Sequence, residues 1–255
     1  FFQAEDGIRG LVRSRGLGDV YKRQDNNLSV IVDAIRNARV IVDNIRKVIY
    51  YLVSTSITEI VLISTSIFAG LPLPLLPIQI LWINLVTDGV QDKTFPFIKE
   101  EGDVMIRPPT RPSSQFFDKS QIRRIMAFGL SMGGLGFVLF WHLLGTYSYE
   151  MAVSIMFTSV VCFQWSNGLQ AQLEHEPFLL DIRKSVSINP YIFLGVGVGI
   201  VLQLIGIYVI PGVFGVVPLA AEHWGYVIAL SLAAFFVIEA IKWLEYRGSH
   251  PTVRI

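Results

Sequence analysis

Charge is scarce in this sequence. Asp, Glu, Lys and Arg make up 16% of the 255 residues and apolar residues 52%, whereas about a quarter of a soluble domain is charged. Apolar runs long enough to cross a bilayer recur along the chain. This balance excludes an ordinary soluble domain and predicts an all-α membrane protein with several spanning helices.

Cysteine is almost absent as well. The single cysteine, Cys162, lies inside an apolar run, so a disulfide framework is excluded. No internal repeat or low-complexity segment is visible, and the net charge of +1 gives no sign of a nucleic-acid partner. The position of the charges along the chain is more informative than their sum.

Lysine and arginine are missing from three connecting segments, residues 70–76, 145–150 and 211–223. Residues 99–124 and 173–189, which alternate with these segments, contain several. Because cytoplasmic loops are the basic ones, we expect an integral, multi-pass protein with both termini cytoplasmic. The six predicted spans, which would form a transmembrane bundle in the lipid bilayer, are residues 48–69, 77–97, 125–144, 151–171, 191–210 and 224–246.

Two segments precede the first span. Residues 1–24 are polar, rich in Gly and Arg and without helical periodicity. They resemble translated sequencing-adapter sequence, and we interpret them as a non-native or disordered leader. Residues 25–47 have the apolar stripe of an amphipathic helix, with no Pro or Gly before the first span. They predict a cytoplasmic stalk helix that continues into a six-span membrane domain, residues 48–255.

The second span carries Asn84, Thr87 and Asp88, which share one face of a helix. An aspartate near the middle of a membrane costs a few kcal/mol or more and usually marks an ion or substrate path. Gly89, the next residue, lets the helix open so that backbone carbonyls can join the carboxylate as ligands. Oxygen ligands suit a hard cation such as calcium or sodium. The pattern predicts an ion site, with a polar contact between helices as the alternative.

The first span contains one acid, Glu59, with Thr55 and Ser56 one turn before it. These side chains are expected to form a polar stripe that faces the bundle interior. The short loop at residues 70–76 makes the first two spans an antiparallel hairpin. Glu59 and Asp88 should therefore lie at similar depth.

Glycine spacing in two later spans indicates packing. Gly129 and Gly133 lie four residues apart in the third span, and Gly195 and Gly199 in the fifth. Small residues at this spacing allow two helices to approach closely. We expect a structural role for these glycines.

Polar residues in the fourth and sixth spans have simple structural interpretations. Gln164, Asn167 and Gln170 recur every three residues, which predicts a polar stripe that faces the bundle interior. Glu239 and Lys242, three residues apart near the end of the sixth span, are interpreted as a salt bridge at the membrane surface.

Residues 71–79 and 84–89 resemble the fifth and sixth transmembrane helices of P-type cation-transporting ATPases, of the calcium-pump and sodium-potassium-pump class. Residues 25–27 and 43–47 resemble the stalk of that family, and residues 103–109 its cytoplasmic loop after the sixth helix. The similarity runs from about Asp25 to the C-terminus. The resemblance implies the membrane half of an ATP-driven cation pump.

The resemblance also implies which residues bind the transported ion. Gln164 stands where the calcium pumps of the sarcoplasmic type have a glutamate, so one remaining ion site, or a different ion, is expected. Calcium is the first candidate, with sodium, potassium or manganese as alternatives. After Gly89 the sequence departs from the usual Leu-Pro-Ala continuation, since it reads Val90-Gln91-Asp92. The positions that match ion ligands of the family are Glu59, Asn84, Thr87, Asp88, Ser56 and Gln164.

Two motifs of the family do not occur in the sequence, namely D-K-T-G, which holds the phosphorylated aspartate, and the hinge motif G-D-G-x-N-D. The resemblance implies that actuator, phosphorylation and nucleotide-binding domains, with their Mg-ATP, precede Asp25. The full-length parent would be the ion-translocating ATPase, and this fragment alone would not be catalytically competent. A stand-alone channel or secondary transporter, or a non-catalytic membrane-anchoring fragment, is the alternative.

Overall fold

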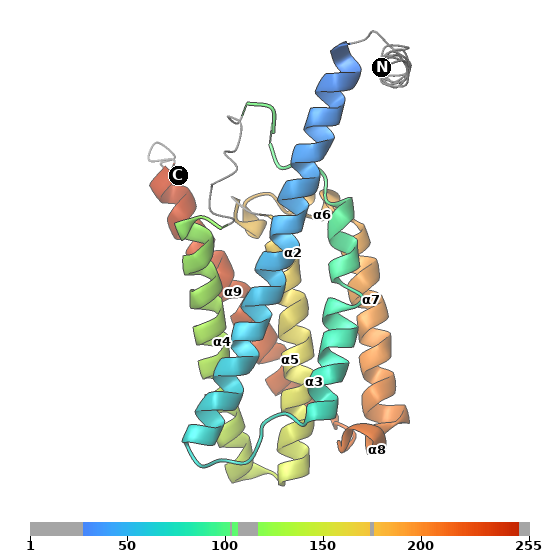
Figure 1. Cartoon of the computed structure of the whole chain (residues 1–255). Coiled ribbons are helices and arrows are strands. Elements are labelled where there is room, and N and C mark those ends of the chain that lie inside the picture. Colours follow the sequence, from blue (N-terminus) through green and yellow to red (C-terminus); the bar gives the residue numbers. More distant parts are fainter. Residues whose placement is uncertain (1–27, 103, 107–116, 174–175, 250–255) are drawn as a thin grey trace, which may run out of the picture. The chain divides into compact units, whose positions relative to one another are not determined.

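The computed structural model describes residues 28–102, 104–106, 117–173 and 176–249 (Figure 1). The side chains of Leu28, Thr87, Asp88 and Ser249 are outside the description, as is the predicted leader at residues 1–24. The chain divides into two compact units, Phe1–Val40 and Ile41–Ile255. Throughout the described residues the secondary structure is helical, without strands, which confirms the all-α prediction.

The first described helix, α2, runs without interruption from Leu28 to Phe68. One helix therefore covers most of residues 25–47 and of the first predicted span, while the role of stalk stays a prediction. Inside the second unit, hydroxyl groups of α2 bond within the helix: Ser54 and Thr58, for example, donate to backbone carbonyls three or four residues earlier. The helix ends before Gly70, whose φ of 69° lies in the left-handed region that glycine adopts easily.

The second predicted span is not one regular α-helix. Helix α3 covers Pro77–Ile83, a π-helical segment η1 covers Asn84–Asp88, and a 3-10 helix η2 covers Asp92–Phe97 (Figure 1). The regular α-helix is therefore interrupted near the predicted position, but by a hydrogen-bonded π-helical turn that begins at Asn84, five residues before Gly89. π-Helical segments occur frequently at functional sites.

The remaining helices match the third to sixth predicted spans closely. Asp118 caps α4 by accepting a hydrogen bond from the backbone N–H of Gln121 at 2.7 Å. Ser148 caps α5 in the same way. The elements are α4 Lys119–Thr146, α5 Tyr149–Ala171, η3 Phe178–Leu180, α6 Ile182–Ser187, α7 Tyr191–Leu204, the π-helical η4 Ile205–Val209, α8 Pro211–Phe214, η5 Ala221–His223 and α9 Trp224–Ser249.

Helix α5 is the centre of the second unit. It packs against α9, α4, α3 and α7, and every residue from Ala152 to Val161 is buried. Ten consecutive buried residues include all sides of a helix, since one turn takes 3.6 residues. Its large side chains Met156, Phe157 and Phe163 belong to the main hydrophobic core of the unit.

The four spaced glycines lie at close contacts between helices, as predicted. A methyl group on Gly129 would collide with Ile57 of α2, and one on Gly133 would lie 2.6 Å from Cβ of Val61. On α7, a methyl group on Gly195 or Gly199 would lie 2.9 Å from a side-chain carbon of Thr94 or Trp165. Glycine at these positions lets α4 reach α2 and lets α7 reach both η2 and α5.

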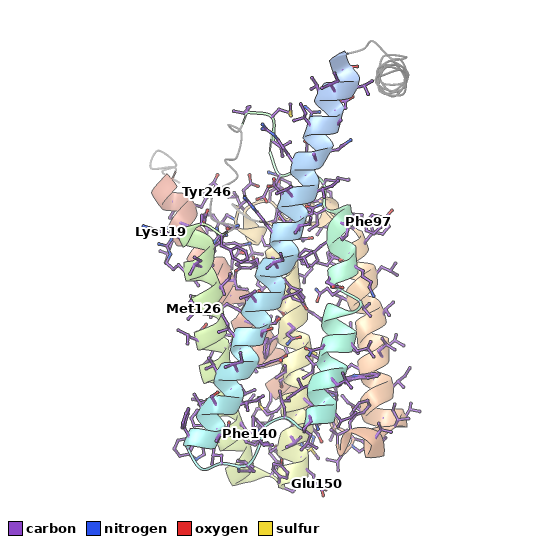
Figure 2. All side chains as sticks on the ribbon, viewed as in Figure 1. Phe97, Lys119, Met126, Phe140, Glu150 and Tyr246 are labelled. Atoms are coloured by element: carbon purple, nitrogen blue, oxygen red, sulfur yellow. The ribbon has the colours of Figure 1, made fainter. Side chains whose placement is uncertain are left out.

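Four helices of the described chain are long and apolar enough to cross a membrane: residues 29–68, 119–146, 191–209 and 221–248. The second predicted span falls short because it opens at Asn84, and the fourth, α5, carries a polar stripe. Six spans therefore remain a prediction. Figure 2 shows Lys119, Tyr246 and Phe97 at one end of the second unit and Phe140 and Glu150 toward the other.

Candidate cation site

The backbone of the opened helix has an unusual hydrogen bond. The N–H of Gly89 donates to the carbonyl of Asn84 at 2.9 Å instead of to Leu85, which a regular α-helix would use. The φ of Gly89 is −77°, an ordinary helical value. Glycine is needed for another reason, because a methyl group at this position would collide with the carbonyl oxygen of Leu85.

Two of the predicted ligands meet directly. Gln164 of α5 donates from Nε2 to Oε1 of Glu59 on α2 at 2.8 Å. Gln164 is buried, and its Oε1 accepts no hydrogen bond from the described residues. An orphaned amide oxygen beside a carboxylate is suited to bind a cation or a water molecule.

The hairpin places Glu59 and η1 at similar depth. The hydroxyl of Tyr51 on α2 donates to Oε1 of Gln91 at 3.2 Å, which fixes the register of the two antiparallel segments. Glu59 lies eight residues after Tyr51, about 12 Å along a helix, and Asn84 lies seven residues before Gln91. Both therefore lie in the same layer of the structure.

Ser56 and Asn84 lie on the surface of the chain. Within this chain Ser56 is not part of the buried polar stripe, because Ser54, Thr55 and Thr58 occupy the buried side of α2 and Ser56 is exposed. Thr87 and Asp88 belong to η1 by their backbone, while their side chains are outside the description. The structure thus brings Glu59 and Gln164 together, while Ser56, one turn before Glu59 on α2, is exposed in this chain.

A second polar pair, which the sequence did not reveal as a pair, lies next to the first. Asn167 of α5 donates from Nδ2 to Oγ of Ser54 on α2 at 2.8 Å, and both side chains are fully buried. Oδ1 of Asn167 also lacks a hydrogen-bond partner among the described residues. The three-residue spacing of Gln164, Asn167 and Gln170 predicted a polar stripe on α5, and the burial of these side chains is confirmed. The spacing gave no indication of which residues of α2 they contact.

The interpretation of Glu239 and Lys242 as a surface salt bridge is wrong. Glu239 is buried and accepts hydrogen bonds from Nε2 of Gln170 and from the backbone N–H groups of Phe178 and Leu179, at 2.8–2.9 Å. Lys242 is also buried, and its ammonium group donates to oxygens of Gln170 and Leu173. Each charge stabilises the end of a neighbouring helix, the carboxylate an N-terminus and the ammonium a C-terminus.

No group of three or more His, Cys, Asp or Glu side chains that could hold a metal occurs among the described residues. The described oxygens of this layer belong to carboxylate, amide and backbone groups. The asparagine and carbonyl groups of η1, together with Glu59 and Gln164, are oxygens of this kind. Hard cations accept such mixed oxygen ligands.

A membrane helix that opens beside a carboxylate of its neighbour is typical of membrane transport proteins. Residues 72–244 match the family described as "Cation transporting ATPase, C-terminus". A calcium-transporting ATPase of Bacillus subtilis (strain 168) is 33% identical over 226 residues, which cover 84% of this chain and 24% of the relative. The chain belongs to the P-type cation-transporting ATPases and corresponds to their C-terminal membrane region. It spans about a quarter of the length of this curated relative.

Proposed function

We propose that the chain is the membrane half of an ATP-driven pump and binds the transported calcium ion between α2 and the opened helix. The observation that carries this proposal is the π-helical opening Asn84–Asp88, which lies in the same layer as Glu59. At such an opening, backbone carbonyls and a carboxylate can bind one ion together. The Bacillus subtilis relative is a calcium-transporting ATPase, which supports calcium as the ion.

The ligand set that we propose contains two carboxylates, Glu59 and Asp88. Asn84 and Thr87 would supply neutral oxygens from the same segment as Asp88, and Gln164 would supply its free Oε1. Such a set favours calcium over zinc or copper, which prefer nitrogen and sulfur ligands. With glutamine at position 164, we propose a single ion, with sodium, potassium or manganese as the competitors to be tested.

The exposed polar side chains support a site that is completed by another part of the protein. Ser56 and Asn84 lie on the surface of helices that we place in the membrane, where a polar group facing lipid is costly. We infer that a further helix of the longer parent covers this face and adds ligands to the ion. The actuator, phosphorylation and nucleotide-binding domains of that parent would hold Mg-ATP.

We propose six spans, with both termini in the cytoplasm. Helix α2 would then extend from the membrane as the stalk that carries motion from the phosphorylation domain to the ion. An uninterrupted helix is a rigid element suited to this role. This chain by itself would bind no nucleotide and hydrolyse no ATP.

The test is calcium-dependent phosphorylation by ATP of the full-length protein in membrane vesicles. Asp88→Asn and Glu59→Gln should each weaken the apparent calcium affinity at least about tenfold, equivalent to about 1.4 kcal/mol. Glu150→Gln is the matched control, because Glu150 is exposed at the far end of α5 (Figure 2). It should leave the affinity unchanged.

Equal calcium affinity in the wild type and Asp88→Asn would contradict the proposed site. Calcium uptake by the chain in liposomes without ATP would favour the channel or secondary transporter instead. If the full-length protein is not phosphorylated with any of the four ions, a non-catalytic anchoring role is the better explanation. The three outcomes are distinct.

A further inference from the structure

Gln91 lies directly after the opening of the helix and is completely buried. Its Oε1 accepts a hydrogen bond from the hydroxyl of Tyr51 on α2 at 3.2 Å. Its Nε2 donates to the backbone carbonyl of Trp165 on α5 at 3.3 Å. One side-chain amide therefore connects the opened segment to two other helices.

The surrounding helices are shaped to admit this side chain. A methyl group on Gly168 of α5 would collide with Nε2 of Gln91, so the glycine leaves the space that the amide occupies. On the opposite side, a methyl group on Gly195 of α7 would lie 3.5 Å from Cα of Gln91. The carbonyl of Gln91 also begins η2, since it accepts from the N–H of Thr94 at 3.0 Å and from its hydroxyl at 2.7 Å.

Backbone hydrogen bonds four residues apart make a regular α-helix rigid. The second predicted span loses this pattern between Asn84 and Gln91. The position of such a segment depends on side chains that anchor its ends. Gln91 lies three residues after Asp88, so a shift of its amide is transmitted over less than one turn. The usual Leu-Pro-Ala continuation of the family has a proline at this place, and proline carries no amide side chain.

We propose that Gln91 is a positioning residue, whose amide fixes the opened segment Asn84–Asp88 against α2 and α5 and so sets the calcium affinity and the preference for calcium over manganese. The inference rests on the proposed function, because it assumes that this segment holds the ion. It depends on the close approach of Gln91 to Gly168.

A purely structural role for Gln91 makes a different prediction. Loss of a packing contact lowers the amount of folded protein, but the molecules that do fold bind the ion normally. Loss of a positioning contact leaves folded molecules whose ligands are misplaced. Affinity measured separately from the maximal level of phosphorylation therefore distinguishes the two roles.

The experiment compares Gln91→Leu with Gln172→Leu in the full-length protein. Gln172 is the matched control: it is also a fully buried glutamine that donates to a backbone carbonyl, that of Ser185 at 3.1 Å, but it lies beyond the end of α5. Phosphorylation is titrated with calcium and with manganese and normalised to its maximum. We expect Gln91→Leu to weaken calcium binding about fivefold, the effect of one or two lost hydrogen bonds. The ratio of calcium to manganese affinity should change with it, and Gln172→Leu should change neither.

Gly168→Ala is the second variant and tests the same contact from the other side. Its methyl group should displace the Gln91 amide and weaken calcium binding in the same direction. In a Gln91→Ala background the collision is gone, so Gly168→Ala should have little further effect, as coupled neighbours do in a double-mutant cycle. Because Gly168→Ala adds only one methyl group, it still tests the inference if the Gln91→Leu protein does not reach the membrane.

Unchanged affinities in both Gln91→Leu and Gly168→Ala would overturn the inference, as would additive effects of the two positions. Asp88→Asn separates this failure from that of the proposed function. If Asp88→Asn weakens binding while the Gln91 and Gly168 variants bind normally, only the positioning role is wrong. If Asp88→Asn binds calcium normally, the ion site itself is wrong.

Discussion

Glu239 and Lys242 lie three residues apart on α9, and their charged groups share one partner, the side-chain amide of Gln170, which donates from Nε2 to the carboxylate and accepts at Oε1 from the ammonium group. The carboxylate accepts from the N–H groups of Phe178 and Leu179 at the start of η3. The ammonium donates to the carbonyls of Gln170 and Leu173 at the end of α5. The two residues therefore attach α9 to both sides of the connection between α5 and α6.

This arrangement predicts that Glu239→Gln destabilises the protein. An amide can replace only one of the two acceptor oxygens, so at least one buried N–H loses its partner, at a cost of about 1–3 kcal/mol. Thermal unfolding of the purified protein in detergent, followed by tryptophan fluorescence, measures the change. Glu222→Gln is the control, because the Glu222 side chain is 74% exposed. Equal unfolding temperatures in the two variants would show that the buried contacts of Glu239 contribute nothing.

The contact between α4 and α2 predicts opposite results for two adjacent glycines. Gly133→Leu should be destabilising by about 1–3 kcal/mol, the usual cost of overpacking, because even a methyl group would lie 2.6 Å from Val61. Gly134→Leu should be tolerated, since a methyl group there has no neighbour within 4 Å. The same unfolding measurement applies. If Gly134→Leu is as damaging as Gly133→Leu, the contact with Val61 does not explain the loss, since leucine favours a helix more than glycine does at both positions.

The proposed topology predicts which exposed serines can be labelled from outside the cell. In a Cys162→Ala background, Ser148→Cys should react with a membrane-impermeant maleimide on intact cells, whereas Ser187→Cys should react only after permeabilisation. Both serines are exposed and isosteric with cysteine. The reason is the absence of Lys and Arg at residues 145–150 and their presence at residues 173–189. Labelling of Ser187→Cys in intact cells would contradict the assignment.

The helices themselves were largely predictable from the sequence. The predicted fourth and fifth spans, residues 151–171 and 191–210, agree with α5 and with α7 plus η4 to within two residues. The ends of these helices are set by local features that can be read from the sequence, such as the N-cap Ser148 before α5. An interruption of the second span near Gly89 was also predictable, but not its form, a π-helical turn that begins at Asn84.

The partners of the polar side chains were not predictable in the same way. Glu59 meets Gln164 across 105 positions of sequence, and Gln91 reaches Trp165 across 74. Ser56 illustrates the difficulty, because it is exposed although its neighbour Thr55 is buried. The rotation of α2 about its own axis decides which of the two faces the core. That rotation depends on where α4 and α5 pack, which α2 alone does not specify.

Local sequence was enough to predict that the chain is helical, which segments form its helices and which polar residues interrupt them. These properties follow from hydropathy, charge and backbone preference within a few residues of each position. The burial of Glu239 and Lys242 around Gln170, and the space that Gly168 leaves for the amide of Gln91, could not be read from the sequence. Those facts depend on the distances and rotations between helices, and packing against distant segments sets them.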